Sequence, residues 1–96
     1  MSRWVSPEAA RALLDRGAQV VDVRSEVEYA AGHVPGSLNL PMHLIPTLAS
    51  EKLPLGRPLV VCCQSGARSA MAVQYLCRAG FDAHDLGPWI FHPDLA

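Results

Sequence analysis

The chain has 96 residues, half of them hydrophobic and 18% charged, which is the composition of an ordinary folded domain. Eight basic and nine acidic side chains give a formal net charge of -1, so the charge favours neither nucleic acid nor an acidic membrane as a partner. No stretch has the ~18 consecutive apolar residues of a membrane span, and none at the start resembles a signal peptide. We therefore expect one domain over residues 1–96, located in the cytoplasm.

The first half of the chain predicts one helix, two strands and a second, short helix. Ser6 is a suitable N-cap for a helix that Gly17 ends. The apolar run 19–23 predicts a buried parallel strand. Residues 25–28 form a capping box at the start of the short helix, and 38–40 are long enough for only a brief strand.

The second half predicts the remaining elements around a central strand. The segment 41–58 supplies core side chains, but Pro41, Pro46 and Pro54 exclude a long helix, so we expect one or two short helical turns. The elements expected after it are, in order, a strand at 59–62, a helix at 67–79 closed by Gly80, a weak strand at 81–86, and a turn at 87–90 followed by an apolar tail. Alternating strands and helices indicate an α/β domain with a mainly parallel sheet.

Two polar residues fall at the ends of predicted strands. Asp22 lies near the end of the first strand, and Cys63 directly follows the central one. In parallel sheets the carboxyl ends of the strands share one edge, where functional groups gather. We therefore expect Asp22 and Cys63 to lie at the same edge.

The loop after Cys63 has the features of an anion cradle. Residues 64–68 supply backbone N–H groups without a proline, and Gly66 allows a positive φ angle. The following helix directs its positive end at the same place, which favours the reactive thiolate form of a cysteine. This arrangement suits a sulfur nucleophile whose product anion is held by N–H groups, such as a persulfide or a phosphocysteine.

The other cysteines and the histidines do not form a disulfide or zinc pattern. Cys62 and Cys63 alternate across a strand, so a bridge between them would be strained, and the total of three cysteines favours reduced thiols. Neither a Cys-x2-Cys pair nor zinc-type histidine spacing occurs, so we predict no metal. Cys77 reads as a helix core residue, and Cys62 as a core residue with a resolving role as the minority alternative.

Three segments together resemble the rhodanese family of sulfurtransferases. They are Val20-Val21-Asp22-Val23-Arg24, the stretch from Glu28 to Pro41 that contains Gly32-His33-Val34-Pro35-Gly36, and Cys63-Gln64-Ser65-Gly66-Ala67-Arg68-Ser69. The resemblance implies a three-layer α/β fold with a central, mainly parallel five-stranded sheet flanked by helices. It also implies a sulfane sulfur carried as a persulfide on Cys63, without a metal or organic cofactor.

The resemblance further implies a substrate and roles for the loop. Thiosulfate would donate its outer sulfur to Cys63 and release sulfite, and cyanide or a thiol would then accept that sulfur. The substrate-binding residues would be Gln64, Ser65, Gly66, Ala67 and Arg68. Related phosphatases place five residues between cysteine and arginine, whereas this chain has four, so we predict no useful phosphatase activity.

Several features leave alternatives open. Arg68 either draws in the anionic substrate or braces the loop against Asp22 or Glu28, and bracing is slightly favoured. Asp22 and Arg24 read as scaffold residues, and Ser69 as a hydrogen-bonding residue at the helix start. Gln64 places a neutral side chain where efficient thiosulfate enzymes often have a cation, which predicts modest thiosulfate turnover.

The chain departs from the family pattern near its end, and a second function fits the same motifs. The closing motif of the family usually has a second glycine where Pro88 stands, and Trp89 comes earlier than the tryptophan of that motif. The wall beside the loop is therefore expected to differ.

The alternative function is a sulfur-relay or protein-interaction module that hands the persulfide to a protein acceptor. The physiological donor, the acceptor and the oligomeric state do not follow from the sequence.

Overall fold

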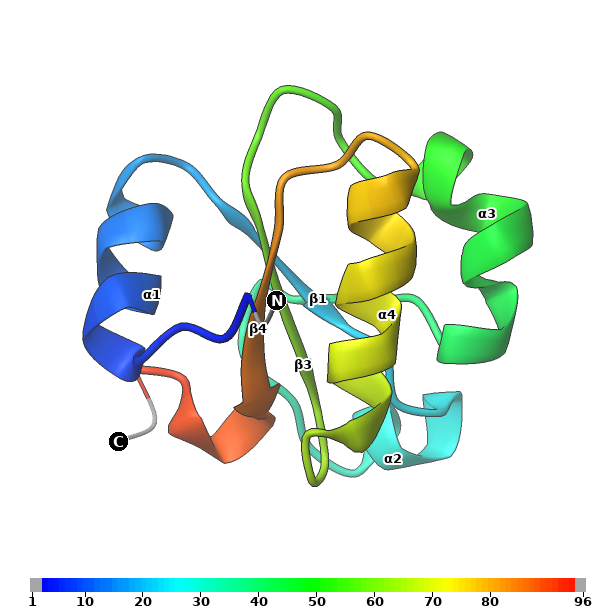
Figure 1. Cartoon of the computed structure of the whole chain (residues 1–96). Coiled ribbons are helices and arrows are strands. Elements are labelled where there is room, and N and C mark those ends of the chain that lie inside the picture. Colours follow the sequence, from blue (N-terminus) through cyan, green and yellow to red (C-terminus); the bar gives the residue numbers. More distant parts are fainter. Residues whose placement is uncertain (1–2, 95–96) are drawn as a thin grey trace.

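The computed structural model describes residues 3–94, which form a parallel sheet with helices on both faces (Figure 1). The helices and strands are, in chain order, α1 (Pro7–Asp15), β1 (Gln19–Asp22), α2 (Glu26–Ala30), β2 (Leu38–Asn39), the 3-10 turn η1 (Met42–Leu44), α3 (Ile45–Lys52), β3 (Leu59–Cys63), α4 (Ala67–Arg78), β4 (Ala83–Pro88) and the 3-10 turn η2 (Trp89–Phe91). The α/β class with a parallel sheet is therefore confirmed.

The sheet has the strand order β2-β1-β3-β4, and all three strand pairs are parallel. Its registers pair Val21 with Leu38, Val20 with Val60, and Val61 with Asp85. Parallel strands end at one edge, so the segments that follow β1, β3 and β4 leave the sheet at the same end of the molecule (Figure 1).

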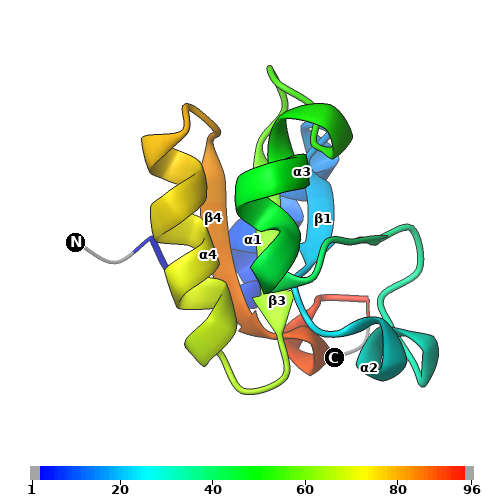
Figure 2. The same ribbon diagram turned by 90° about the vertical axis from the view of Figure 1, so that its right-hand side faces the viewer.

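Two apolar clusters lie on opposite faces of this sheet. α3 and α4 pack on one face, where the cluster includes Val21, Val61 and Cys63. α1 packs on the other face, where the cluster includes Val60 and Cys62. Figures 1 and 2 show α1 on the far side of the sheet from α3 and α4. The three-layer arrangement follows from β3, whose five residues are all buried, because each face must be covered.

Side-chain caps fix the helices near the site. The Ser6 Oγ accepts a hydrogen bond from the Ala9 N–H (3.1 Å) at the start of α1, as the sequence predicts. At the start of α2, the Ser25 Oγ accepts from the Glu28 N–H (3.3 Å), and the Glu28 carboxylate accepts from the Ser25 N–H (3.0 Å). The predicted capping box is confirmed, and it holds Glu28 in a defined orientation.

The last strand differs from its predicted position. It begins at Ala83 rather than at residue 81, and it continues through Gly87 and Pro88, where the sequence predicts a turn. The register shifts between Val61 and Cys62, so β4 contains an irregularity of the β-bulge kind before Gly87, whose φ is 81°. The bulge and the glycine let the strand extend past the predicted turn.

The sheet has four strands in residues 3–94, not the five that the resemblance implies. Trp4 forms an isolated parallel bridge to Asp85, with hydrogen bonds from the Val5 N–H to the Asp85 carbonyl and from the Asp85 N–H to the Arg3 carbonyl, each 2.9 Å. The missing strand is thus reduced to one bridge, because the helix α1 begins at Pro7, three residues later. No helix in the described part of the chain is long and apolar enough to cross a membrane.

Candidate active site

Cys63 is the last residue of β3, and its side chain is buried under the loop that follows. The Gly66 N–H donates a hydrogen bond to the Cys63 Sγ over 2.9 Å. Gly66 is the N-cap of α4 and has φ 104°, a left-handed conformation that glycine adopts readily. This conformation turns the backbone so that an N–H group points at the sulfur, as an anion-holding loop requires.

Ser69 closes the loop from the helix side. Its Oγ donates to the Gly66 carbonyl (3.1 Å) and lies 3.4 Å from the Cys63 Sγ, within hydrogen-bond distance for sulfur. The side chain is fully buried. Ser69 therefore ties both ends of the turn to the first turn of α4, in agreement with a hydrogen-bonding residue at a helix start.

Arg68 is paired with Glu28, not with Asp22. Its Nη1 and Nη2 donate to the two Glu28 carboxylate oxygens over 2.6 and 2.9 Å. The hydrogen bond from Arg68 lowers the pKa of Glu28 from its ordinary value of 4.5 to about 2. The two-bond geometry is the arrangement that a bracing role of Arg68 requires, because it joins the start of α4 to α2.

Asp22 and Arg24 form a buried ion pair at the end of β1. The Arg24 Nη2 lies 2.8 Å from one Asp22 oxygen, and the Arg24 backbone N–H donates to the other over 3.0 Å. The Asn39 side-chain amide donates to the Asp22 and Arg24 carbonyls, each over 3.0 Å. The Arg24 Nη2 also donates to the Gly32 carbonyl (2.7 Å), so this pair fixes the connection from β1 to α2.

Trp89 forms a wall beside the Cys63 loop, in the segment where this chain departs from the family pattern. The Arg24 Cζ lies over the Trp89 indole ring, 4.7 Å from the ring centroid. The Trp89 Nε1–H donates to the Gln64 Oε1 over 3.3 Å. A Cβ added to Gly66 would lie 3.8 Å from the Gly87 Cα and from the Pro88 Cδ. The end of β4 therefore lies directly against the Cys63 loop.

The predicted site residues are brought to one end of the sheet. Cys63 and Ser69 are buried, and Gln64, Ser65 and Ala67 are exposed on the outer side of the loop. The buried pair of Asp22 and Arg24 lies behind the wall formed by Trp89. No group of three or more His, Cys, Asp or Glu side chains in residues 3–94 is arranged to hold a metal ion.

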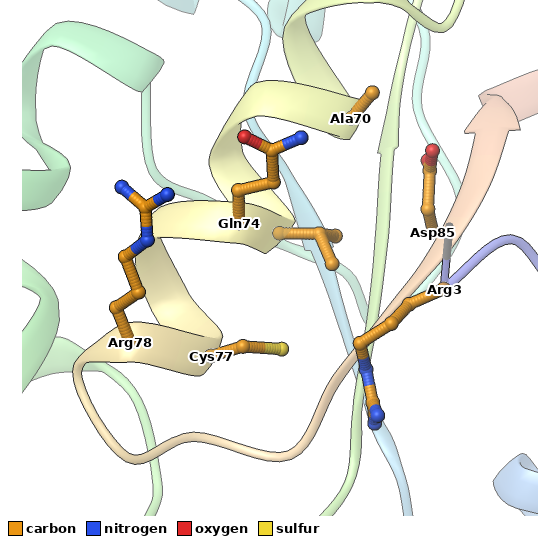
Figure 3. A pocket seen from close by; sticks show the side chains of 7 residues that line it. Arg3, Ala70, Gln74, Cys77, Arg78 and Asp85 are labelled. Atoms are coloured by element: carbon orange, nitrogen blue, oxygen red, sulfur yellow. The ribbon is translucent and has the colours of Figure 1, made fainter. Parts of the chain in front are cut away.

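Cys62 and Cys77 lie outside this arrangement. Cys62 packs in the cluster on the α1 face, opposite to Cys63, and burial raises the pKa of its thiol. Cys77 is half-buried and lines a hollow of about 580 Å³ between α4 and β4. In Figure 3 its sulfur points from α4 toward the side of Arg3 and Asp85. Neither thiol faces the Cys63 loop.

Two residues that organise the site, Asn39 and Trp89, have roles that the sequence does not predict. The sequence indicates only a brief strand around Asn39, although an amide between two apolar residues of such a strand signals a specific hydrogen-bonding role. For Trp89 the sequence indicates only a place in the wall beside the loop. Its contacts to Arg24 and Gln64 join segments 65 and 25 residues away, and no local pattern predicts such a link.

A family model for the rhodanese-like domain matches residues 6–87 of this chain. The chain belongs to the rhodanese-like domain family. A thiosulfate sulfurtransferase GlpE from Pseudomonas paraeruginosa is 40% identical over 77 residues, which cover 80% of this chain and 69% of that protein. The crystal structure of a rhodanese-related protein from Thermoplasma volcanium has a TM-score of 0.82 and 25% identity, and the match covers 96% of this chain and 90% of that one.

A sulfurtransferase from Allochromatium vinosum is 48% identical over 62 residues. That match covers 65% of this rhodanese-like chain and 57% of the relative, so the aligned part spans little more than half of that protein's length. The fold and the family are thus established.

Proposed function

We propose that this rhodanese-like domain is a thiosulfate sulfurtransferase in which Cys63 is the catalytic residue. The observation that carries the proposal is the Gly66 N–H directed at the Cys63 Sγ over 2.9 Å within a buried loop at the start of α4. Such a donor stabilises negative charge on the Cys63 sulfur. It acts both on the attacking thiolate and on the thiolate that leaves when an acceptor takes the sulfur. The relative at 40% identity is named a thiosulfate sulfurtransferase, and the relative at 48% identity is named a sulfurtransferase, which supports the proposal.

The proposed first step is a displacement at sulfur. The Cys63 thiolate attacks the outer sulfur of thiosulfate, and a bond forms between the two sulfur atoms. The bond to the sulfonate group breaks, and sulfite leaves with the electron pair. Cys63 then carries a persulfide anion, which cyanide, a thiol or a protein acceptor discharges.

The roles of the other site residues follow from their contacts. Gln64, Ser65, Gly66, Ala67 and Arg68 would surround the transferred sulfur as the substrate-binding loop. Asp22, Arg24 and Ser69 would support that loop without touching the substrate. Arg68 would act mainly through Glu28, because the carboxylate already occupies both of its terminal nitrogens. We further infer that residues 1–96 form one domain, since both apolar clusters share one sheet.

Mass spectrometry after exposure to thiosulfate tests the proposal. The wild-type chain is expected to gain about 32 Da, the mass of one sulfur, on the peptide that contains Cys63. Cys63→Ser is the matched control and should gain nothing. Failure of the wild type to gain this mass would overturn the sulfurtransferase proposal. Release of thiocyanate from cyanide by the wild type, and not by Cys63→Ser, then separates an enzyme from a module that discharges only onto a protein partner.

A further inference from the structure

A hollow of about 270 Å³ borders the Cys63 loop. Its lining residues are Arg24, Glu28, Ala31, Gly32, Gln64 and Trp89. Gln64 follows Cys63 directly, so the loop and the hollow share a wall. Figure 2 shows α2, the loop after β3 and the segment after β4 at the same end of the molecule. A hollow of a few hundred Å³ has the size of a site for a small organic molecule.

The charged groups of this hollow are already compensated by protein partners. The Arg24 guanidinium binds the Asp22 carboxylate and the Gly32 carbonyl. The Glu28 carboxylate accepts from Arg68 and from the Ser25 backbone. The hollow thus offers one cation and one anion, each neutralised, and Gln64 adds no charge. This balance does not favour a doubly charged anion such as thiosulfate over a neutral molecule.

The uncharged surfaces of the hollow suit a carbon skeleton. Trp89 presents a half-buried indole, and Ala31 presents an exposed methyl group at the C-cap of α2. A Cβ at Gly32 would lie 3.6 Å from the Trp89 Cη2, so the absence of a side chain there leaves room beside the ring. The Gln64 amide, held through its Oε1 by the Trp89 Nε1–H, supplies a polar group at the loop side.

We infer that this hollow binds the carbon skeleton of the sulfur acceptor, and that the acceptor is a small organic thiol without net charge. The inference rests on the proposed function and adds a specificity site to it. The acceptor thiol loses its proton to solvent, and its thiolate attacks the outer sulfur of the Cys63 persulfide. The new S–S bond forms on the acceptor, the bond to the Cys63 Sγ breaks, and Cys63 leaves as a thiolate next to the Gly66 N–H. The acceptor departs as a persulfide, and no external oxidant or reductant is consumed.

Ala31→Leu tests the inference, because the longer side chain fills the hollow from the exposed side without entering the core. The control is Ala30→Leu, the same change at the adjacent exposed residue of α2, which does not line the hollow. Each protein is loaded with thiosulfate, and kcat/KM is measured for dithiothreitol, an uncharged thiol, and for cyanide. Dividing the first value by the second removes any change common to both acceptors.

Ala31→Leu is expected to lower this ratio by about tenfold through a higher KM for dithiothreitol, the effect of losing a close apolar fit. Ala30→Leu should leave the ratio within twofold of the wild type. An unchanged ratio in Ala31→Leu, or an equal fall in both variants, overturns the inference. Discharge by cyanide or a protein thiol but not by dithiothreitol also overturns it while the proposed function stands. A wild type that forms no persulfide removes the proposed function itself.

Discussion

Arg68 and Glu28 join α4 to α2 through two parallel hydrogen bonds of 2.6 and 2.9 Å. Arg68 lies in the first turn of α4, directly after the Cys63 loop, whereas Glu28 belongs to the capping box of α2. The orientation of the loop therefore depends on a helix that begins four residues after β1. Since Asp22 is bound by Arg24, Glu28 is the carboxylate left for Arg68 at this edge.

The Glu28 pair predicts a loss of stability in acid. The pKa of Glu28 is lower in the folded state, about 2, than its ordinary value of 4.5. A carboxylate with a lowered folded-state pKa stabilises the protein above its unfolded-state pKa, and this contribution is lost as the pH falls from 4.5 toward 2. Urea unfolding measured over this range should show a smaller fall for Glu28→Gln than for the wild type.

Glu26→Gln is the control for that experiment, because Glu26 is an exposed acidic residue in the first turn of the same helix. It should keep the wild-type dependence on pH. The attribution to Glu28 would be wrong if Glu28→Gln and the wild type lost stability in parallel from pH 4.5 to 2.

The buried pair at the end of β1 predicts a large cost when one charge is removed. Asp22→Asn leaves the Arg24 guanidinium buried without its anion, and should lower the free energy of unfolding by about 3 kcal/mol in urea denaturation. Asp82→Asn is the exposed counterpart, since it removes the 2.7 Å pair with Arg3 at the surface. That change should cost less than about 1 kcal/mol. An equal loss in the free energy of unfolding for the two variants would show that the buried pair contributes no more to stability than the surface pair.

The left-handed conformation of Gly66 predicts that alanine there disturbs transfer as well as stability. Gly66→Ala should lower the free energy of unfolding by about 1 kcal/mol, because an L-residue is strained at φ 104°. The neighbouring atoms of Gly87 and Pro88 at 3.8 Å leave ordinary contact distance, so the strain comes from the backbone. Relaxation of this strain would move the N–H group away from the Cys63 Sγ and slow persulfide formation.

Gly56→Ala provides the comparison, since Gly56 has φ 82° in an exposed turn with nothing within 4 Å of an added Cβ. It should show a similar loss of stability with an unchanged rate of persulfide formation. If both alanine variants formed the persulfide at the wild-type rate, the Gly66 N–H would have no part in that step.

Cys62 is predicted to be unreactive despite its position next to Cys63. Burial raises the pKa of the Cys62 thiol, so very little thiolate is present near neutral pH. In a Cys63→Ser, Cys77→Ser background, iodoacetamide should label Cys62 only after urea unfolding. Labelling of the folded protein at the rate of a free cysteine would restore a resolving role for Cys62.

The central part of the site could be predicted because its signals are local. The β-branched run before Cys63, the glycine at residue 66 and the helix pattern after it lie within one continuous segment. The shared edge of Asp22 and Cys63 follows from the rule that parallel strands end together. The two cysteines on opposite faces follow from alternation along a strand.

The remaining features depend on contacts between distant segments. Phe81 looks like a strand residue and is buried, but pairing of Ala83 with Leu59 decides where β4 starts. The choice of Glu28 over Asp22 as the partner of Arg68 depends on where the capping box places α2. The position of Trp89 under Arg24 depends on the bulge in β4, which no pattern in residues 81–90 signals.

The hydrogen bonds that Arg3 and Val5 form with β4 affect self-association. An open strand at the edge of a sheet offers unpaired N–H and C=O groups to a second chain. Here the edge groups of β4 are occupied within the molecule: the Ala83 carbonyl accepts from the Arg3 Nε, the Asp85 backbone bonds to Arg3 and Val5, and the Gly87 N–H donates to the Asp85 carboxylate. Residues 3–5 thus block the addition of a strand from a second chain at this edge. Their removal would expose unpaired backbone groups of β4 and favour aggregation.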